Sequence, residues 1–140
     1  MIVRVYPDAC IVIDLVQGER ALRQRLIAAL NRVSGESPLV AYSDLTRLEC
    51  RVRPLAMANT ALLERYDRFF STPGYVRVAF DTEMFDSATA LRARHGLKTP
   101  DALHLAAAIA SGCEEFWTND ERLVRAADKR IRIVPSDRFA

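Results

Sequence analysis

The sequence has few cysteines, almost no lysine and no long apolar run. Its 140 residues include three cysteines, at positions 10, 50 and 113, too few and too odd for a disulfide framework. No apolar stretch approaches the roughly 20 residues that a membrane-spanning helix needs. The opening segment MIVRVYPDAC lacks the basic, apolar and small-residue order of a secretion signal. These absences favour a cytoplasmic protein with no membrane partner.

The composition is that of an ordinary globular domain. Half of the residues are hydrophobic and 27% are charged, which excludes intrinsic disorder for most of the chain. The length is typical of one domain, and no linker, repeat or low-complexity tract divides it. We therefore expect residues 1–140 to form a single domain.

The basic residues are nearly all arginine. Lysine occurs only at 98 and 129, so arginine supplies the other 18 of the 20 basic residues, against 18 acidic ones. Arginine binds phosphate through a rigid fork, but a GC-rich genome would produce the same bias. Because the net charge is only +2, nucleic-acid binding would depend on local clustering rather than on a bulk basic field.

Short β-type segments alternate with amphipathic helical ones. We expect strands at 2–6, 38–42, 75–80, 115–118 and 131–134, and helices at 19–33, 43–54, 54–70, 82–95, 99–111 and 121–128. Pro54 should end one helix and open the next. Thr99 should cap the helix of TPDALHLAAA. The alternation predicts an α/β fold with a mostly parallel central sheet covered on both faces.

Four acidic residues fall at positions that this fold brings together. Asp8 and Asp120 each come within two residues of a strand end, where functional groups of parallel sheets gather. Asp101 lies in a first helical turn, and Glu49 lies between two apolar neighbours. Such a cluster repels itself unless a cation is present, and Mg²⁺ takes carboxylate oxygens. Because no Cys–His or Ser–His arrangement accompanies the acids, they indicate metal-dependent phosphodiester hydrolysis.

Each acid also has a purely structural interpretation. Asp8 could cap the helix after its strand, and Asp120 could cap the helix from residue 121. Asp101 could be only a first-turn acid, and Glu49 could lie on the solvent face of its helix. Periodicity leaves these alternatives open, and the shared sheet edge favours the metal site.

Four segments together resemble a known family. They are the strand ending at Asp8 with IVIDL after it, SDLTRLE, TPDALHLAAA and TND. They resemble the PIN domain and, within it, the VapC toxins of bacterial type II toxin–antitoxin systems. The resemblance extends over essentially the whole chain and implies a Rossmann-like, three-layer α/β/α fold.

The resemblance also implies an activity, a ribonuclease that depends on Mg²⁺ or Mn²⁺. Its catalytic acids and metal ligands would be Asp8, Glu49, Asp101 and Asp120, and Thr118 would be the hydroxyl residue that orients them.

One departure concerns the residues after the first acid. Family members usually carry hydroxyl or amide residues there, whereas this sequence has Ala9 and Cys10. Support for Asp8 must therefore come from elsewhere.

The partners that the resemblance implies are an RNA substrate and a VapB-type antitoxin whose tail covers the acidic site. VapC toxins also commonly form homodimers. The IVIDL segment and the aromatic residues at 66, 69 and 70 are candidate partner surfaces, and core packing would explain them equally well.

Other residues have two interpretations each. Arg47 and Arg51 share a helix face and could contact RNA phosphate, or they could form a solvated face. His104 lies one helical turn after the third acid and could touch substrate phosphate or make a local hydrogen bond. Cys10 and Cys50 should be small buried residues, because soft thiolates do not suit Mg²⁺.

Two other functions remain open. A PIN-type nuclease could act in RNA processing or on DNA flaps, which the short length disfavours. A non-catalytic α/β binding module, such as a receiver-like domain, would need paired acids near the first strand and a suitably placed lysine, which the sequence lacks. Metal-dependent RNA cleavage would separate enzyme from binding module, and a neighbouring antitoxin gene would separate toxin from processing enzyme.

Overall fold

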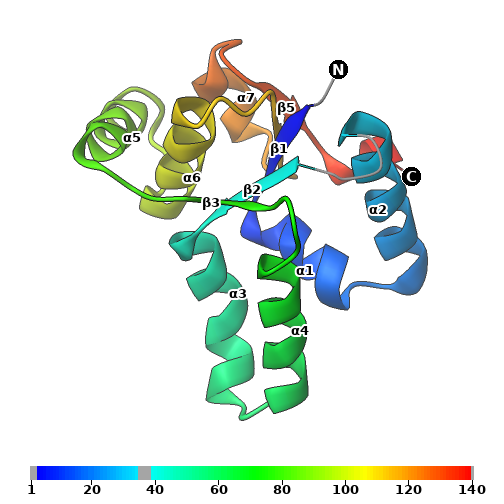
Figure 1. Cartoon of the computed structure of the whole chain (residues 1–140). Helices are drawn as coiled ribbons and strands as arrows, with labels where there is room; N and C mark the ends of the chain where they lie inside the picture. The colour runs from blue at the N-terminus through cyan, green and yellow to red at the C-terminus, as the bar shows by residue number, and fades with distance from the viewer. Residues whose placement is uncertain (1–2, 35–38, 140) are drawn as a thin grey trace.

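A parallel β-sheet forms the centre of the protein (Figure 1). The computed structural model describes residues 3–34 and 39–139, and within them the sheet has five strands. They are β1 (Arg4–Pro7), β2 (Leu39–Ser43), β3 (Val76–Val78), β4 (Glu115–Trp117) and β5 (Arg132–Val134). The order is β3-β2-β1-β4-β5, and every neighbouring pair is parallel. The predicted parallel sheet is confirmed, with β1 in the middle.

Helices cover both faces of this sheet (Figure 1). They are α1 (Ala9–Gln17), α2 (Arg20–Ser34), α3 (Asp44–Ala56), α4 (Thr60–Phe70), α5 (Thr82–His95), α6 (Thr99–Ala110) and α7 (Arg122–Ala127), followed by the 3-10 turn η1 (Ser136–Phe139). Helices α3 and α4 form a pair that extends away from the sheet. Among the described helices, none is both long and apolar enough to cross a membrane.

The strand pleat divides the core into two layers. Successive strand residues point to opposite faces, so Val5 and Trp117 pack with α1 and α2, whereas Tyr6 and Phe116 pack with α5, α6 and α7. All four side chains are fully buried. This arrangement confirms the expected three-layer α/β/α architecture.

The helix boundaries around Pro54 differ from the prediction. Helix α3 continues past Pro54 to Ala56, because a proline this close to a helix end removes only one intrahelical hydrogen bond. Pro54 does not open the next helix either. Helix α4 begins at Thr60, after Asn59, whose side chain accepts a hydrogen bond from the Leu62 amide at 3.2 Å.

The ends of α5 and α6 follow the sequence closely. Gly96 ends α5 in the left-handed conformation, with φ +66°, as predicted. The cap of α6 is Lys98, which makes no side-chain capping bond, so Thr99 is the first helical residue rather than the cap. At the other end the cap is Ser111, so the last helical residue is Ala110, one residue before the predicted end of the helix. The segment SGESP, between the predicted helix at 19–33 and the predicted strand at 38–42, lies mostly outside the described residues.

Most of the apolar residues proposed as partner surfaces belong to the core, whereas Ile13 and Phe69 are half-buried. Those buried are Ile11, Val12, Leu15, Val16, Tyr66 and Phe70. Four of the eight large apolar residues that are exposed in the described part of the chain lie on α3 or just after it, at Leu48, Val52, Leu55 and Met57. The core interpretation therefore applies to the first set.

Candidate active site

Asp8 lies between β1 and α1, and both of its carboxylate oxygens are held. Oδ1 accepts a hydrogen bond from the Ile11 amide at 3.0 Å, which makes Asp8 the N-cap of α1. Oδ2 accepts a hydrogen bond from the Thr118 hydroxyl at 2.5 Å. Because Pro7 pairs with Trp117, the next residue of each strand emerges at the same sheet edge. The capping role of Asp8 is real, and it places the carboxylate beside Thr118.

Three of the four predicted acids line one cavity. This cavity has a volume of about 580 Å³, and its lining includes Asp8, Asp101, Thr118 and Asp120. The Thr118 hydroxyl oxygen also accepts a hydrogen bond from the Asp120 amide at 3.1 Å. One hydroxyl group therefore fixes the side chain of Asp8 and the backbone of Asp120.

Arg122, which no sequence pattern indicated, lies beside two of these acids, Asp120 and Asp101. Its Nε donates to Asp120 Oδ1 at 2.9 Å and its Nη2 donates to Asp120 Oδ2 at 2.5 Å. The same Nη2 lies 3.8 Å from Asp101 Oδ2. The planar guanidinium matches a carboxylate with two parallel bonds. The only signal in the sequence is an arginine two residues after Asp120, within TNDER.

Glu49, the fourth predicted acid, lines a neighbouring groove and not this cavity, although its charge acts on Asp101. Its side chain is 31% exposed, and Oε1 makes a hydrogen bond with Nε2 of His104. His104 is only 2% exposed, and its Nδ1 lies 2.7 Å from the hydroxyl of Tyr6. The local hydrogen-bond interpretation of His104 matches this position, which leaves neither ring nitrogen free for a phosphate.

The electrostatic environment of the acids is uneven. Burial raises the pKa of the Asp8 and Asp101 carboxyls above the ordinary value, and the nearby Asp120 charge raises that of Asp101 further. The hydrogen bond from Arg122 holds the pKa of Asp120 below its ordinary value. Ionising Asp8 and Asp101 is therefore costly unless a positive charge compensates them.

The donor set fits a hard divalent cation in its chemistry. Asp8, Asp101 and Asp120 supply carboxylate oxygens to one cavity, and Mg²⁺ and Mn²⁺ take such ligands. Within residues 3–34 and 39–139, no three acidic, histidine or cysteine side chains are grouped closely enough to hold an ion as they stand. Arg122 gives a physical reason for this spacing of the acids, because its guanidinium pairs with Asp120 and faces Asp101.

Cys10 departs from the prediction of a buried residue. It is exposed and lines the acidic cavity. Burial and the nearby carboxylates raise the pKa of its thiol, so the thiol stays protonated and is a poor ligand for Mg²⁺. Cys50 is buried, as predicted. The support for Asp8 comes from Ile11 and Thr118, and not from residues 9 and 10.

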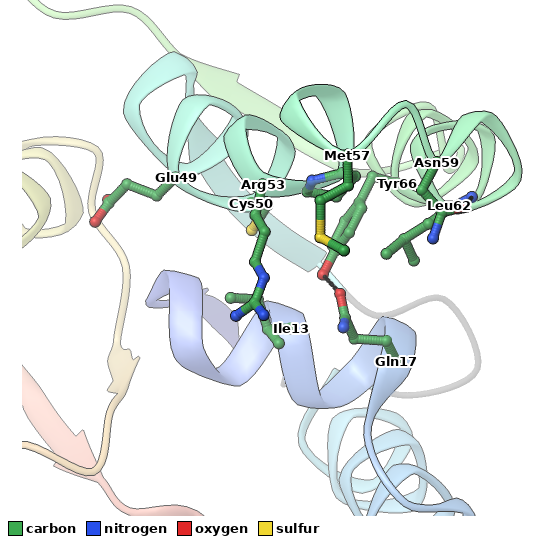
Figure 2. A pocket seen from close by; sticks show the side chains of 10 residues that line it. Ile13, Gln17, Glu49, Cys50, Arg53, Met57, Asn59, Leu62 and Tyr66 are labelled. Atoms are coloured by element: carbon green, nitrogen blue, oxygen red, sulfur yellow. Dashed lines mark hydrogen bonds between the residues drawn. The ribbon is translucent and has the colours of Figure 1, made fainter.

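A groove of about 480 Å³ lies between α1 and the α3–α4 pair (Figure 2). Ile13 and Leu62 contribute to its apolar lining, and Arg53 reaches from α3 toward α1. At one end the Tyr66 hydroxyl donates to Gln17 Oε1. Glu49 lines the other end, and Figure 2 shows its side chain pointing away from the rest of the groove.

The two arginines of α3 are paired with acids. Arg47 Nη1 lies 3.2 Å from Asp44 Oδ1, and Arg51 Nε lies 3.2 Å from Asp67 Oδ1. Both arginines are about one-third exposed. Neither lines the acidic cavity, so a contact with RNA at these positions remains a prediction.

Comparisons with known proteins agree with this architecture. A family model described as the PIN domain matches residues 5–129, and the chain belongs to the PIN domain family. A search of curated proteins found no match.

Several solved structures share the fold. A toxin–antitoxin complex from Klebsiella pneumoniae has 26% sequence identity and a TM-score of 0.63, and the match covers 83% of this chain and 86% of that chain. VapBC2 from Rickettsia felis, bound to a promoter DNA fragment, has 14% identity, a TM-score of 0.74 and coverage of 94% and 98%. FitAcB from Neisseria gonorrhoeae has 15% identity, a TM-score of 0.65 and coverage of 94% and 97%.

Proposed function

We propose that this protein is a ribonuclease that depends on Mg²⁺ or Mn²⁺ and acts as the toxin of a VapBC-type toxin–antitoxin pair. The observation that carries the proposal is the shared cavity of Asp8, Asp101 and Asp120, tied together by Thr118. PIN domains are generally nucleases that use divalent metals. Similar folds occur in the toxin–antitoxin complexes described above.

The chain's own residues divide the work at this cavity. Asp8, Asp101 and Asp120, together with Glu49, would hold the ion, and Thr118 keeps Asp8 in place. A bound divalent ion would supply an activated water molecule and would stabilise charge that develops on the phosphodiester.

Arg122 can contribute to this site from its position beside Asp120. Its guanidinium, 59% exposed at the cavity, matches a phosphate as well as it matches a carboxylate. In the proposed enzyme Arg122 exchanges Asp120 for a phosphate of the RNA, which frees the carboxylate for the ion.

The direct test is cleavage of structured RNA by purified protein in the presence of Mg²⁺ or Mn²⁺. Asp101→Asn should abolish cleavage while circular dichroism shows an unchanged fold. A matched control is Asp86→Asn, which changes an exposed acid of α5 that lines neither the acidic cavity nor the groove. Full activity in Asp101→Asn would contradict the proposal, and loss of cleavage in both variants would show that the effect is not specific to the cavity.

The same proposal includes a VapB-type antitoxin, for which the groove of Figure 2 offers a docking surface. The groove leads to Glu49, and Met57, which is exposed just after α3, is part of its lining. An apolar peptide fits such a groove, and a basic residue on it could pair with the acids as Arg122 does. The product of a neighbouring small gene should co-purify with the protein, and Met57→Glu, which places a charge in the groove, should weaken that association.

Three further statements belong to the proposal. Residues 1–140 would act as one domain, in the cytoplasm, and as a homodimer. Sedimentation would test the last of these, with an expected mass of twice the 15.8 kDa of one chain. The alternatives of an RNA-processing nuclease and of a non-catalytic module would be separated by the antitoxin association and by the cleavage assay, respectively.

A further inference from the structure

A line of polar side chains runs from the protein core to Glu49. Tyr6 is fully buried, and its hydroxyl lies 2.9 Å from Ser43 Oγ and 2.7 Å from Nδ1 of His104. The other ring nitrogen of His104 makes the hydrogen bond with Glu49 Oε1. Ser43 and His104 are buried as well. Buried polar groups are costly unless they are bonded, and here the bonding leads to a candidate metal ligand.

The proton on Nε2 of His104 is assigned from the hydrogen bond of this nitrogen with Glu49. An ionised carboxylate has no proton to donate, so Nε2 of His104 carries the proton that Glu49 accepts. Nδ1 makes the second hydrogen bond of the ring, with the Tyr6 hydroxyl at 2.7 Å. Both nitrogens of the ring are thereby fixed.

The same side chains connect three of the four segments that carry the candidate acids. Tyr6 is in β1, two residues before Asp8, and His104 is in α6, three residues after Asp101. Ser43 caps α3, the helix that carries Glu49. The line therefore ties together β1, α3 and α6 at the depth just below the cavity.

We propose that His104 is a positioning residue for Glu49, and that Tyr6 holds the ring of His104 in the required orientation. The inference rests on the proposed metal-dependent function. A partly exposed glutamate samples several rotamers, and fixing it costs entropy. Because His104 already holds Oε1 in the folded protein, ion binding does not have to supply this entropy cost, and Oε2 is left for an ion. Partners behind a metal ligand commonly act in this way.

The test is Mn²⁺ binding to the purified full chain, measured by calorimetry and by the electron paramagnetic resonance spectrum of the ion. In His104→Asn the shorter side chain does not reach the position of Nε2, so it cannot bond to Glu49. This variant should bind Mn²⁺ about 10- to 100-fold more weakly. His104→Gln places an amide N–H near that position and should restore most of the affinity. Tyr6→Phe keeps the ring, removes only the hydroxyl and should give a smaller loss.

Measuring Mn²⁺ affinity and thermal stability on the same variants distinguishes a structural role of His104 from a positioning role. A merely structural histidine would give Asn and Gln variants whose Mn²⁺ affinities follow their thermal stabilities, whereas positioning predicts a difference in affinity at equal stability. In a Glu49→Gln background, His104→Asn should have no further effect. If His104→Asn does not fold, Tyr6→Phe decides: it should shift the imidazole ¹⁵N resonances of His104 and weaken Mn²⁺ binding.

The outcomes separate this inference from the proposed function. Wild-type protein that binds no Mn²⁺ would overturn both. Wild-type protein that binds Mn²⁺ and cleaves RNA, with unchanged affinity in His104→Asn and Tyr6→Phe, would overturn the inference alone.

Discussion

Asp8 has a structural and a chemical role that two substitutions can separate. Its Oδ1 caps α1 and its Oδ2 accepts the Thr118 hydrogen bond, while its charge belongs to the candidate metal site. Asp8→Asn removes the charge and keeps a capping oxygen. Asp8→Ala removes the charge, the cap and the partner of Thr118. Because both variants are neutral, the cost of burying a charge cancels when they are compared.

The expected difference follows from the two lost contacts. Replacing an N-cap side chain by alanine costs about 1 kcal/mol, and asparagine caps as well as aspartate does. In Asp8→Asn the Nδ2 that replaces Oδ2 can donate to the Thr118 oxygen, whereas Asp8→Ala has no bond to Thr118 at all, which costs roughly 0.5–1.5 kcal/mol more. Asp8→Ala should therefore be less stable than Asp8→Asn by about 2 kcal/mol, which corresponds to a Tm lower by roughly 4–10 °C in a chain of this size.

Urea unfolding and Mn²⁺ titration on the same samples provide the assay. Both variants should bind Mn²⁺ at least tenfold more weakly than the wild type, and only Asp8→Ala should lose stability. An Asp8→Asn variant as unstable as Asp8→Ala would refute the capping argument. An Asp8→Asn variant with wild-type affinity would refute the assignment of Asp8 as a metal ligand.

Other predictions concern the helix cap, the pH dependence and the arginines. Gly96→Ala should cost about 1 kcal/mol in urea unfolding, because φ is +66° and nothing lies within 4 Å of an added Cβ, so only backbone strain acts. The raised pKa of Asp8 and Asp101 means that the stability they contribute is complete below the ordinary value of 3.8 and is lost as the pH rises through the raised pKa. Without metal, the stability of the double variant Asp8→Asn with Asp101→Asn should therefore increase relative to that of the wild type as the pH rises to 7. Arg47→Ala with Arg51→Ala should weaken RNA binding and reduce its salt slope by roughly 0.7 for each lost phosphate contact.

Each of these predictions has a contradicting result. Unchanged stability of Gly96→Ala would contradict the left-handed cap. Parallel pH profiles of wild type and double variant would contradict the burial effect on the two carboxyls. An unchanged salt slope would reject the role of the arginines in RNA binding, and alanine at the exposed Arg20 and Arg25 of α2 serves as the control for lost positive charge.

The fold could be predicted because local patterns and parallel topology agree. Alternating strands and helices require crossover connections, and these place helices on both faces of the sheet. Gly96 marked a helix end because a left-handed cap favours glycine. Pro54 was misjudged because a proline near a helix end removes a single bond, and Thr99 because Lys98 takes the cap position with its backbone alone.

The candidate site could be predicted only in part. Asp8 and Asp120 follow paired strands, so their closeness is a consequence of topology. The contact of Tyr6 with His104 joins residues 98 positions apart, and a histidine within an Ala-rich apolar helix gives no sign of its partners. Arg122 is near Asp120 in the chain, but nothing local shows that its side chain folds back on the acids.

The most direct test of the central claim is the sequencing of cellular RNA ends after expression of the wild type and of Asp8→Asn. The account predicts new, recurrent RNA ends in cells with the wild-type protein and their absence with Asp8→Asn at equal protein level. The same set of RNA ends in both samples would contradict the claim that this acidic cavity cleaves RNA.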